Sequence, residues 1–532
     1  MLTANWVPVL RLMLRRDRVS LPVWLISVWL FCVIFVPMFP GMAGTSEEIA
    51  TLGEMMKNPA MVAMCGLIYG DAYTYGVMYT QLMLVWSGLL VAVMNILIVV
   101  RHTRGEEDEG RLEVVRALPA GRLSSLMATT GLVIGLNVLL ALLTGFSMPL
   151  FGVASIDLAG SLVYGAALGA VGLVFAGITL VVVQLVHSAG AATGTSLALL
   201  GAFYVLRAYG DVGSEWAGRV SPLGLIERTY PYYSNLWWPV VTLLLACAVL
   251  IAAAFGLAGR RDLGRGLLPE AGGRRAHASR WLADEWGLAW RLTRGTILAW
   301  GVAVFLLAAA YGSVMSDMEN FVQSNQLYQL LVGIGAGTTN AVGPVTSNLL
   351  LMMGMLGTIP VLTTAFKLHA EERSGRLDAV LGKSVSRVRL YGGYALLVLL
   401  VAIAMQLLAA IGFWTVARMV MTNPVSASLV LKAAFVYGAG LLAFGGLGLL
   451  LVGVAKRLTW IAWAYLAVTF VVVYLGGLVN LPHWVQKLTP FGLLPSWPTE
   501  PFSWWSWAAL AIGAFALAVV GGVGYRRRDV TA

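Results

Sequence analysis

Charged side chains are scarce in this chain of 532 residues. Asp, Glu, Lys and Arg make up 11% of it and hydrophobic residues 59%, whereas an average soluble domain has roughly 25% charged residues. Between Leu158 and Leu206 no side chain is charged, except His187 when it is protonated. Apolar runs of this length exclude a water-soluble globular protein and indicate that a lipid bilayer surrounds most of the chain.

Cysteine is rare as well. The three cysteines, Cys32, Cys65 and Cys247, lie in or beside apolar runs. They have neither the pairing of a disulfide framework nor the short spacing of a metal site. We therefore expect three packing residues and no bound metal.

A nucleotide-binding motif is also missing. Gly382-Lys383-Ser384 resembles the end of a P-loop, but Leu377 occupies the position where a P-loop needs its first glycine. The centres of the apolar runs contain no Asp or Glu, although a proton-coupled carrier usually needs one there. We expect no catalytic residue, and no cofactor site, in this chain.

Twelve apolar segments are each long enough to cross a bilayer, which takes about 20 helical residues. Amide side chains such as Gln81 and Asn95 interrupt them, and these groups can be satisfied by hydrogen bonds across helices. The sequence therefore predicts an all-α polytopic membrane protein. The expected spans lie within Leu21–Pro40, Ala72–Val100, Leu123–Phe151, two parts of Leu158–Leu206, Pro239–Gly259, Thr296–Met315, Val345–Phe366, Leu390–Ala417, Ala433–Ala455, Leu458–Leu478 and Phe502–Gly524.

A charged segment recurs at matching points of the two halves. Residues 104–122 and 369–387 align at a constant offset of 265, with seven identities in 19 positions. This recurrence predicts a duplication into two six-span repeats, residues 1–265 and 295–532, joined by a linker and a surface helix at 266–294.

An amphipathic helix on the membrane surface is expected before the first span of each repeat, at Trp6–Arg18 and Trp281–Arg294. An even number of spans then places the start of both repeats on the same side of the membrane. The repeats are therefore predicted to be parallel, related by an axis along the membrane normal.

Positive charge is distributed unevenly between the two sides of the predicted spans. With the amino terminus in the cytosol, 28 of the 35 Lys and Arg residues fall in cytosolic segments. By the positive-inside rule we expect both termini and both charged segments in the cytosol, in a bacterial cytoplasmic membrane. The net charge of +10 then has an explanation that involves no nucleic acid.

Each charged segment is predicted to form a short helix with apolar residues inside a charged rim. Such a helix suits docking in the groove of another protein. These docking helices are expected near residues 104–118 and 369–383. The residues assigned to the contact are Glu106, Glu107, Glu109, Gly110, Arg111, Leu112, Glu113, Glu371, Glu372, Gly375, Arg376, Leu377 and Asp378.

The repeated E-E-x-x-G-R-L-E/D pattern resembles the coupling-helix loop of ABC-type exporters with ABCG-like, type V architecture. The fused twelve-span layout, with Asn58-Pro59-Ala60 in the first outer loop, is similar to the exporters of polyketide antibiotics, the tetronasin-type permeases. The resemblance implies a non-enzymatic permease that moves hydrophobic or amphipathic compounds, such as antibiotics, out of the cell. It also implies two copies of a separate ATP-binding cassette subunit, which would bind ATP and Mg²⁺.

In exporters of that kind the second and fifth spans of each half line the transport path. In this chain those spans contain Met, Trp and amide side chains, and Met adapts its shape to varied apolar ligands. The path residues implied by the resemblance are Met78, Gln81, Trp86, Asn95, Tyr204, Asn348, Met352, Met355, Trp460, Trp463 and Tyr465.

Two other functions are compatible with the residues. An ion-gradient-driven secondary multidrug transporter would transport without an ATPase partner. A non-transporting membrane subunit would bind a partner, as an anchor or sensor, without moving a substrate.

Overall fold

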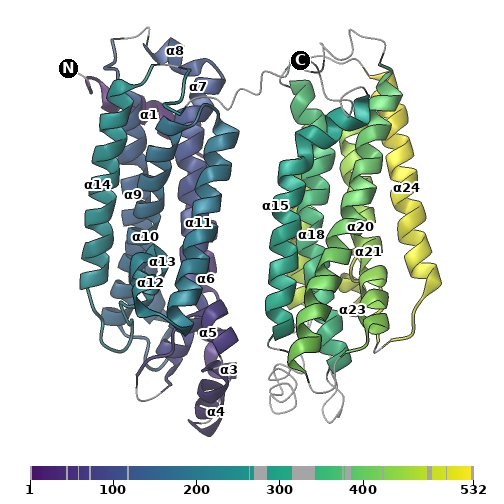
Figure 1. The fold of residues 1–532 in the computed structure, drawn as a ribbon, viewed down its shortest axis with the longest axis horizontal. Helices are drawn as coiled ribbons and strands as arrows, with labels where there is room; N and C mark the ends of the chain where they lie inside the picture. Colours follow the sequence, from purple (N-terminus) through teal and green to yellow (C-terminus); the bar gives the residue numbers. More distant parts are fainter. Residues whose placement is uncertain are drawn as a thin grey trace. The chain divides into compact units, whose positions relative to one another are not determined.

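The residues that the computed structural model describes form helices joined by turns and loops, with no strand among them (Figure 1). Twelve helices within these ranges are long and apolar enough to cross a membrane, which confirms the predicted all-α membrane fold. Asn58, Arg376, Asp378 and residues 382–384, discussed above, lie outside the described ranges. The structure describes residues 3–42, 46–57, 59–70, 73–116, 119–262, 264–268, 284–313, 315, 342–373, 375, 377, 385–421, 425–475, 482–498 and 500–528.

The chain divides into two compact units, Met1–Arg274 and Arg275–Ala532. Within the part of unit 1 that the structure describes, there are six long helices with shorter ones at both ends. The long helices are α2 (Ser20–Val33), α6 (Tyr75–Val100), α9 (Ser124–Ser147), α10 (Leu158–Leu185), α11 (Ala189–Val212) and α14 (Trp238–Arg260). The short ones are α1 (Trp6–Arg16), η1 (Val36–Met38), α3 (Phe39–Met42), α4 (Ser46–Met56), α5 (Pro59–Cys65), the π-helix η2 (Arg101–Gly105), α7 (Glu106–Asp108), α8 (Arg111–Arg116), η3 (Met148–Phe151), α12 (Glu215–Val220) and α13 (Pro222–Glu227).

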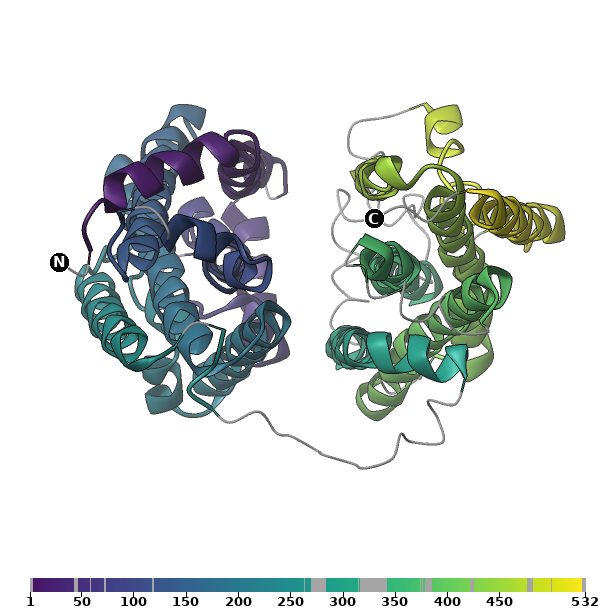
Figure 2. The same ribbon diagram turned by 90° about the horizontal axis from the view of Figure 1, so that it is seen from above.

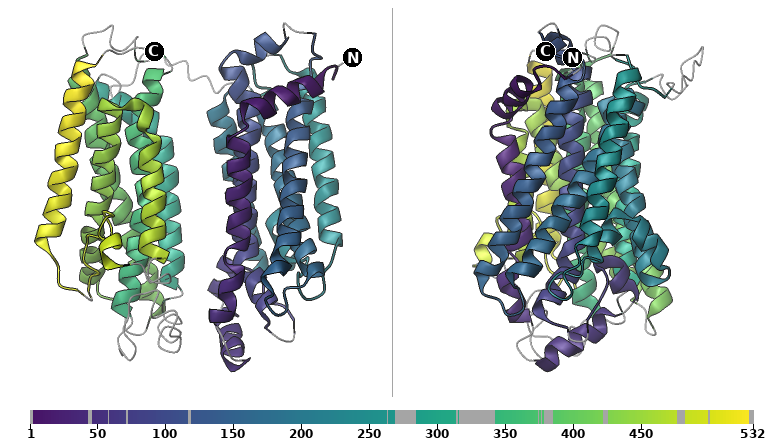
Figure 3. Two further views of the ribbon diagram at one scale, coloured as in Figure 1. Left: turned by 180° about the vertical axis from the view of Figure 1, so that it is seen from behind. Right: turned by 90° about the vertical axis from the view of Figure 1, so that its left-hand side faces the viewer.

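The short helices of unit 1 mark its two ends. In Figure 1, α7 and α8 lie at one end of the bundle and α4 and α5 at the other. We call these the α7/α8 end and the α4/α5 end. The amino-terminal helix α1 lies at the α7/α8 end, crosswise to α2 (Figure 3), and packs against α9.

Helix α10 is the centre of unit 1. It packs against α6, α9, α11 and α14, and 83% of the residues in its most apolar stretch are buried. Small residues make this close packing possible, because a side chain at Gly165 would collide with the backbone of Ala141 on α9. Close approach at small residues is the usual way in which helices associate in lipid.

The described residues of unit 2 include six long helices: α15 (Glu285–Ser313), α18 (Val342–Arg373), α20 (Arg387–Val420), α21 (Ala427–Val454), α22 (Trp460–Leu475) and α24 (Trp504–Arg527). Two short helices, η5 (Lys456–Leu458) and α23 (His483–Gln486), lie between them in sequence. Helix α21 packs against α18, α20 and α24, and α15 packs against α20. The core between them contains large aromatic side chains, such as Phe444 and Phe491.

The two surface helices predicted from the sequence differ in structure. In unit 1 α1 ends at Arg16, and α2 begins separately at Ser20. In unit 2 no break follows the predicted surface helix: α15 runs from Glu285 to Ser313 as one helix. Figure 2 shows its first turns lying across the view and the following turns running along the viewing axis. The predicted surface segment of unit 2 is therefore continuous with the span that follows it, rather than set apart from it by a break as α1 is.

The two segments also differ in the side chain that follows α1. Asp17, whose carboxylate is buried, follows α1 and pairs with His102 and Arg101 beyond α6. When Arg15 and Arg18 are aligned with Arg291 and Arg294, Thr293 takes the place of Asp17. The Thr293 hydroxyl donates to Ala289 O (2.8 Å) within the same helix, so nothing at this position ends α15.

Candidate functional site

At the α7/α8 end of unit 1, the buried carboxylate of Glu107 joins distant parts of the chain. Arg104 Nη1 and Arg261 Nη2 each lie 3.0 Å from Glu107 Oε2, and the N–H of Gly264 donates to Oε1 (2.7 Å). Arg104 is itself fully buried, and its Nε donates to Val183 O at the end of α10 (2.7 Å). Glu107 therefore fixes α7 to the segment after α14, and Arg104 fixes the preceding π-helix to α10.

The other acidic residues of α7 reach two further helices. Glu106 forms ion pairs with Arg16 at the end of α1 and with Arg111 (3.6 Å). Asp108 Oδ2 accepts the N–H of Ala189 at the start of α11 (2.8 Å). Together with Glu107 and Arg104, these contacts tie the segment that follows α6 to α1, α10, α11 and the end of α14.

The π-helix η2 comes directly before α7 and contributes two more contacts. Its residues Arg101 and His102 both face Asp17, and His102 Nε2 lies 2.9 Å from Asp17 Oδ2. π-helical turns inside α-helices occur frequently at functional sites. Here two consecutive side chains of the π-helix reach Asp17, at the junction between α1 and α2.

Unit 2 contains a similar ion pair at the matching residues. Glu372, at the end of α18, is buried and lies 2.6 Å from Arg528 Nη2 and 3.7 Å from Lys456 Nζ. The neighbouring Glu371 is also buried and pairs with Lys367 of the same helix (3.0 Å).

A backbone contact is repeated too. Arg387 Nη1 donates to Arg528 O (2.7 Å), just as Arg122 donates to Arg261 O in unit 1. Both units thus hold the segment after their second long helix through a buried glutamate and an arginine near the end of their last helix.

The predicted docking residues therefore fall into two groups. The carboxylates of Glu107, Glu371 and Glu372 are buried inside their own unit, and that of Glu106 is mostly buried. Glu109, Arg111 and Glu113 are exposed. Leu112 is half-buried, and Leu377 is buried. Gly110 and Gly375 have positive φ angles, 71° and 70°, a conformation that glycine adopts without strain.

The predicted path residues also differ in their surroundings. Four of them, Met78, Gln81, Asn95 and Met355, are buried inside their own unit. Asn95 and Asn137 exchange two amide hydrogen bonds between α6 and α9, with lengths of 3.1 and 2.7 Å, so these amides satisfy each other.

The other path residues are at least partly accessible. Trp86 and Tyr204 are half-buried, with ring centroids 6.5 Å apart on α6 and α11. In unit 2, Trp460 and Trp463 on α22 are exposed. The half-buried path residues of unit 2 are Asn348, Met352 and Tyr465.

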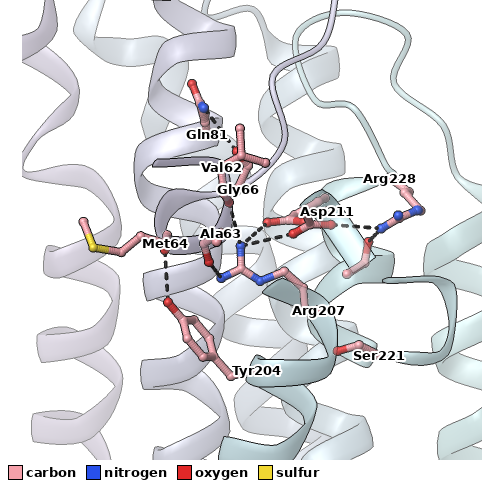
Figure 4. Close-up of polar contacts among 12 residues, drawn as sticks. Val62, Ala63, Met64, Gly66, Gln81, Tyr204, Arg207, Asp211, Ser221 and Arg228 are labelled. Atoms are coloured by element: carbon pink, nitrogen blue, oxygen red, sulfur yellow. Dashed lines mark hydrogen bonds and ion pairs between the residues drawn. The ribbon is translucent and has the colours of Figure 1, made fainter. Parts of the chain in front are cut away.

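A cluster of four buried ionic residues lies at the α4/α5 end of unit 1 (Figure 4). Arg207 Nη1 lies 3.2 Å from both Asp211 Oδ2 and Glu227 Oε1. Arg228 Nη1 lies 3.6 Å from Asp211 Oδ1 and donates to Gly224 O (2.8 Å). The four side chains are between 0 and 8% exposed. Two arginines and two carboxylates thus balance their charges in a site closed to solvent.

This ion cluster also holds the short helix α5. Arg207 Nη2 donates to Ala63 O (2.9 Å), and the Tyr204 hydroxyl donates to Met64 O (3.2 Å). The last carbonyls of a helix have no partners within the helix, and a positive charge there is favourable. Burial raises the pKa of Glu227 above its ordinary value, and the neighbouring Arg207 opposes this shift.

The part of the chain that the structure describes contains no group of three or more His, Cys, Asp or Glu side chains placed to hold a metal ion. A family model described as "Multidrug efflux system permease Rv1217c, C-terminal domain" matches residues 8–260 and 282–526. The chain belongs to this family of multidrug efflux permeases. It is 32% identical to the multidrug efflux system permease protein Rv1217c of Mycobacterium tuberculosis (strain ATCC 25618 / H37Rv), over 98% of this chain and 94% of the relative.

Family membership confirms the prediction of an efflux permease. The ion cluster of the permease was not predicted, because the positive-inside count assigns each Lys and Arg to a side of the membrane and not to a partner. The spacing of Arg207 and Asp211 was a usable signal, since residues four apart lie on one helix face. Glu227 gave no such signal, because its partner is 20 residues away and in another helix.

Proposed function

We propose that this multidrug efflux permease is the membrane subunit of an ATP-driven exporter of hydrophobic or amphipathic compounds. In this proposal two copies of a separate ATP-binding cassette subunit supply ATP and Mg²⁺, one copy for each unit. The α7/α8 end faces the cytosol, as do both termini, and the bilayer is the bacterial cytoplasmic membrane. The bacterial relative is itself named as the permease of a multidrug efflux system, which supports export as the direction.

The main support for ATP-driven coupling is the way in which the α7 segment is anchored. Glu106, Glu107 and Asp108 connect three consecutive positions to α1, to the end of α14 and to α11. A force applied to α7 would therefore move several helices together rather than bend a loose loop. Burial of a charge is costly, so a fully buried arginine such as Arg104 beneath this segment is not expected of a loop that is only solvated.

The exposed residues that follow are the proposed contact with the ATPase. Glu109, Arg111 and Glu113 face solvent around the half-buried Leu112, a pattern that fits a groove in a partner protein. The anchored residues Glu106 and Glu107 would transmit the force, and the exposed residues would receive it. In unit 2, Glu371, Glu372, Gly375 and Leu377 would have the corresponding roles.

The recurrence of the same family match and the same ion pair in both units supports an ABCG-like, type V arrangement in parallel repeats, as in the tetronasin-type exporters. The family model matches one stretch in each half of the chain, and the Glu107–Arg261 pair has its counterpart in Glu372–Arg528. The half-buried Trp86 and Tyr204 of unit 1, with the exposed Trp460 and Trp463 of unit 2, are the best candidates for contact with a transported compound.

The test separates docking from folding. The permease is purified with its ATPase subunit after the double reversal Glu109→Lys/Glu113→Lys, and Arg219→Glu, at an exposed position of the α4/α5 end, serves as the control. Each lost charge-assisted contact is worth roughly 1.5–3 kcal/mol, about tenfold or more in Kd. The double reversal should therefore release the ATPase and abolish ATP-dependent transport, with unchanged thermal stability.

Two outcomes would contradict the proposal. The first is retention of a fully coupled ATPase by the double reversal. The second is transport by the purified permease alone, driven by an ion gradient, which would establish the secondary-transporter alternative.

A further inference from the structure

A cavity of about 570 Å³ lies at the α4/α5 end of unit 1. One wall is α4, with Ile49 and Ala50, and another is the segment before α6, with Ile68, Tyr69 and Tyr73. The turn before α10 closes a third side with Ala154. All these residues belong to unit 1. Cavities of roughly 300–1,000 Å³ lined mainly by apolar and aromatic groups are typical of sites for drug-sized molecules.

The aromatic wall of the cavity is held in place by hydrogen bonds. The Tyr69 hydroxyl donates to Pro231 O (3.0 Å), and the Tyr69 ring packs against Tyr230 at 4.9 Å between centroids. The Tyr73 hydroxyl donates to Gln81 Oε1 (2.7 Å). Burial raises the pKa of both phenols, so both stay uncharged. Because the two hydroxyls bond to the protein, the rings contribute apolar surface to the cavity.

The charged residues of the lining compensate each other. Glu54 and Lys57 form an ion pair of 2.6 Å, and their side chains are 74% and 57% exposed. They therefore lie at the solvent side of the cavity and add no net charge to it. An uncharged aromatic wall with a charged rim favours a ligand with an apolar ring system, whose polar end stays near water.

The wall of the cavity is connected to the ion cluster. Gln81 accepts the Tyr73 hydroxyl and donates to Gly66 O (3.1 Å). Gly66 has a φ of 129°, and a side chain there would collide with the Glu227 carboxylate. The tyrosine wall therefore rests on the segment that Glu227 and Arg207 hold, which gives the cavity a fixed shape before any ligand binds.

We propose that this cavity binds uncharged or amphipathic compounds that contain an aromatic ring system. The proposal deepens the efflux function, on which it rests for its place in transport, because it names a chemical class and a site within unit 1. Gln81, which the resemblance assigned to the transport path, acts here through Tyr73 as a positioning residue of the site.

A labelling experiment on the full-length permease in lipid nanodiscs tests this site directly. The probe is N-phenyl-1-naphthylamine, an uncharged two-ring fluorophore. The three native cysteines are buried, and burial raises the pKa of Cys65 to about 11, which keeps it a poorly reactive thiol. Ala154→Cys then places a reactive thiol in the cavity lining, and Ala159→Cys places one at an exposed position that does not line it.

Saturating probe should slow maleimide labelling of Ala154→Cys at least fivefold and that of Ala159→Cys less than twofold. In a second measurement, probe fluorescence is titrated after subtraction of empty nanodiscs. Ala50→Trp, which fills the cavity, should raise the Kd at least tenfold, and Ala159→Trp should leave it unchanged.

Equal labelling rates with and without probe, or equal slowing at both positions, would overturn the cavity as the binding site. So would an unchanged Kd in Ala50→Trp. Because binding is measured without the ATPase, such a result leaves the proposal of ATP-driven export standing. Protection of Ala154→Cys in a permease that shows no ATP-dependent transport would instead support the site and contradict the proposed function.

Discussion

Replacement of Arg207 by methionine removes one cation from the buried ion cluster and leaves its two carboxylates in place. Methionine has a similar length and no charge, so the packing of α11 changes little. Glu227 loses its 3.2 Å partner, and the end of α5 loses the hydrogen bond to Ala63 O. Removal of one partner from a buried ion pair costs about 3–5 kcal/mol, because an uncompensated charge stays buried.

The thiol of Cys65 offers a local assay for this loss. Cys65 ends α5, is buried, and lies within reach of the Arg207 charge. In a background without Cys32 and Cys247, labelling of Cys65 by a fluorogenic maleimide during heating reports the opening of the α4/α5 end. For a unit of the size of Met1–Arg274, 1 kcal/mol corresponds to roughly 2 °C, so the apparent Tm should fall by roughly 5–10 °C.

Arg219→Met is the matched control. Arg219 forms an ion pair with Glu215, 2.7 Å long, in which both side chains are more than half exposed. Such surface pairs contribute about 0–1 kcal/mol, so this change should shift the apparent Tm by no more than a few degrees.

The double variant Arg207→Met/Glu227→Gln should recover part of the loss. It removes the unpaired carboxylate and leaves Asp211 with Arg228. Equal shifts for Arg207→Met and Arg219→Met would refute the conclusion that this cluster stabilises the α4/α5 end.

Three further predictions concern other parts of the permease. Glu107→Gln should destabilise the α7/α8 end by about 1.5–3 kcal/mol, because the Glu107 bonds are to charged groups, whereas Glu113→Gln should have no measurable effect. Hydrogen exchange of α7 and α8 measures both changes, and equal exchange rates in the two variants would contradict the anchoring role of Glu107. Asn95→Leu should lower the free energy of unfolding by about 1–3 kcal/mol, because it leaves Asn137 buried without its partner. The double variant Asn95→Leu/Asn137→Leu should lower it by less than twice that amount, and additive effects in thermal unfolding would contradict this prediction. Residues 101–122 contain five acids and no net charge, and residues 366–389 have a net charge of +3. If the ATPase groove is basic, retention of the ATPase should be more salt-sensitive at the first segment than at the second. Equal salt dependence at the two segments would argue against unequal docking.

Hydropathy was sufficient to locate the long helices. Residues 158–206 were expected to hold two spans, and the structure separates α10 from α11 by a short turn after Leu185, in which Ser188 caps α11 by accepting the N–H of Ala191 (3.2 Å). Such features are local, because a span needs only about 20 consecutive apolar residues whatever its neighbours are. The ion pair of Asp17 was less accessible, since its partner His102 is far away in the sequence and is brought close only by the packing of the helices.

The sequence by itself determined the solvent of this protein, the number of its spans and the recurrence of a charged segment in each half. Only the tertiary structure decided which of those charges face inward. Glu107 and Arg261 are 154 residues apart, and Arg207 and Glu227 are in different helices. A charge in a sequence has no fixed environment, and whether it is a surface contact or a buried tie depends on which helices pack around it and exclude water.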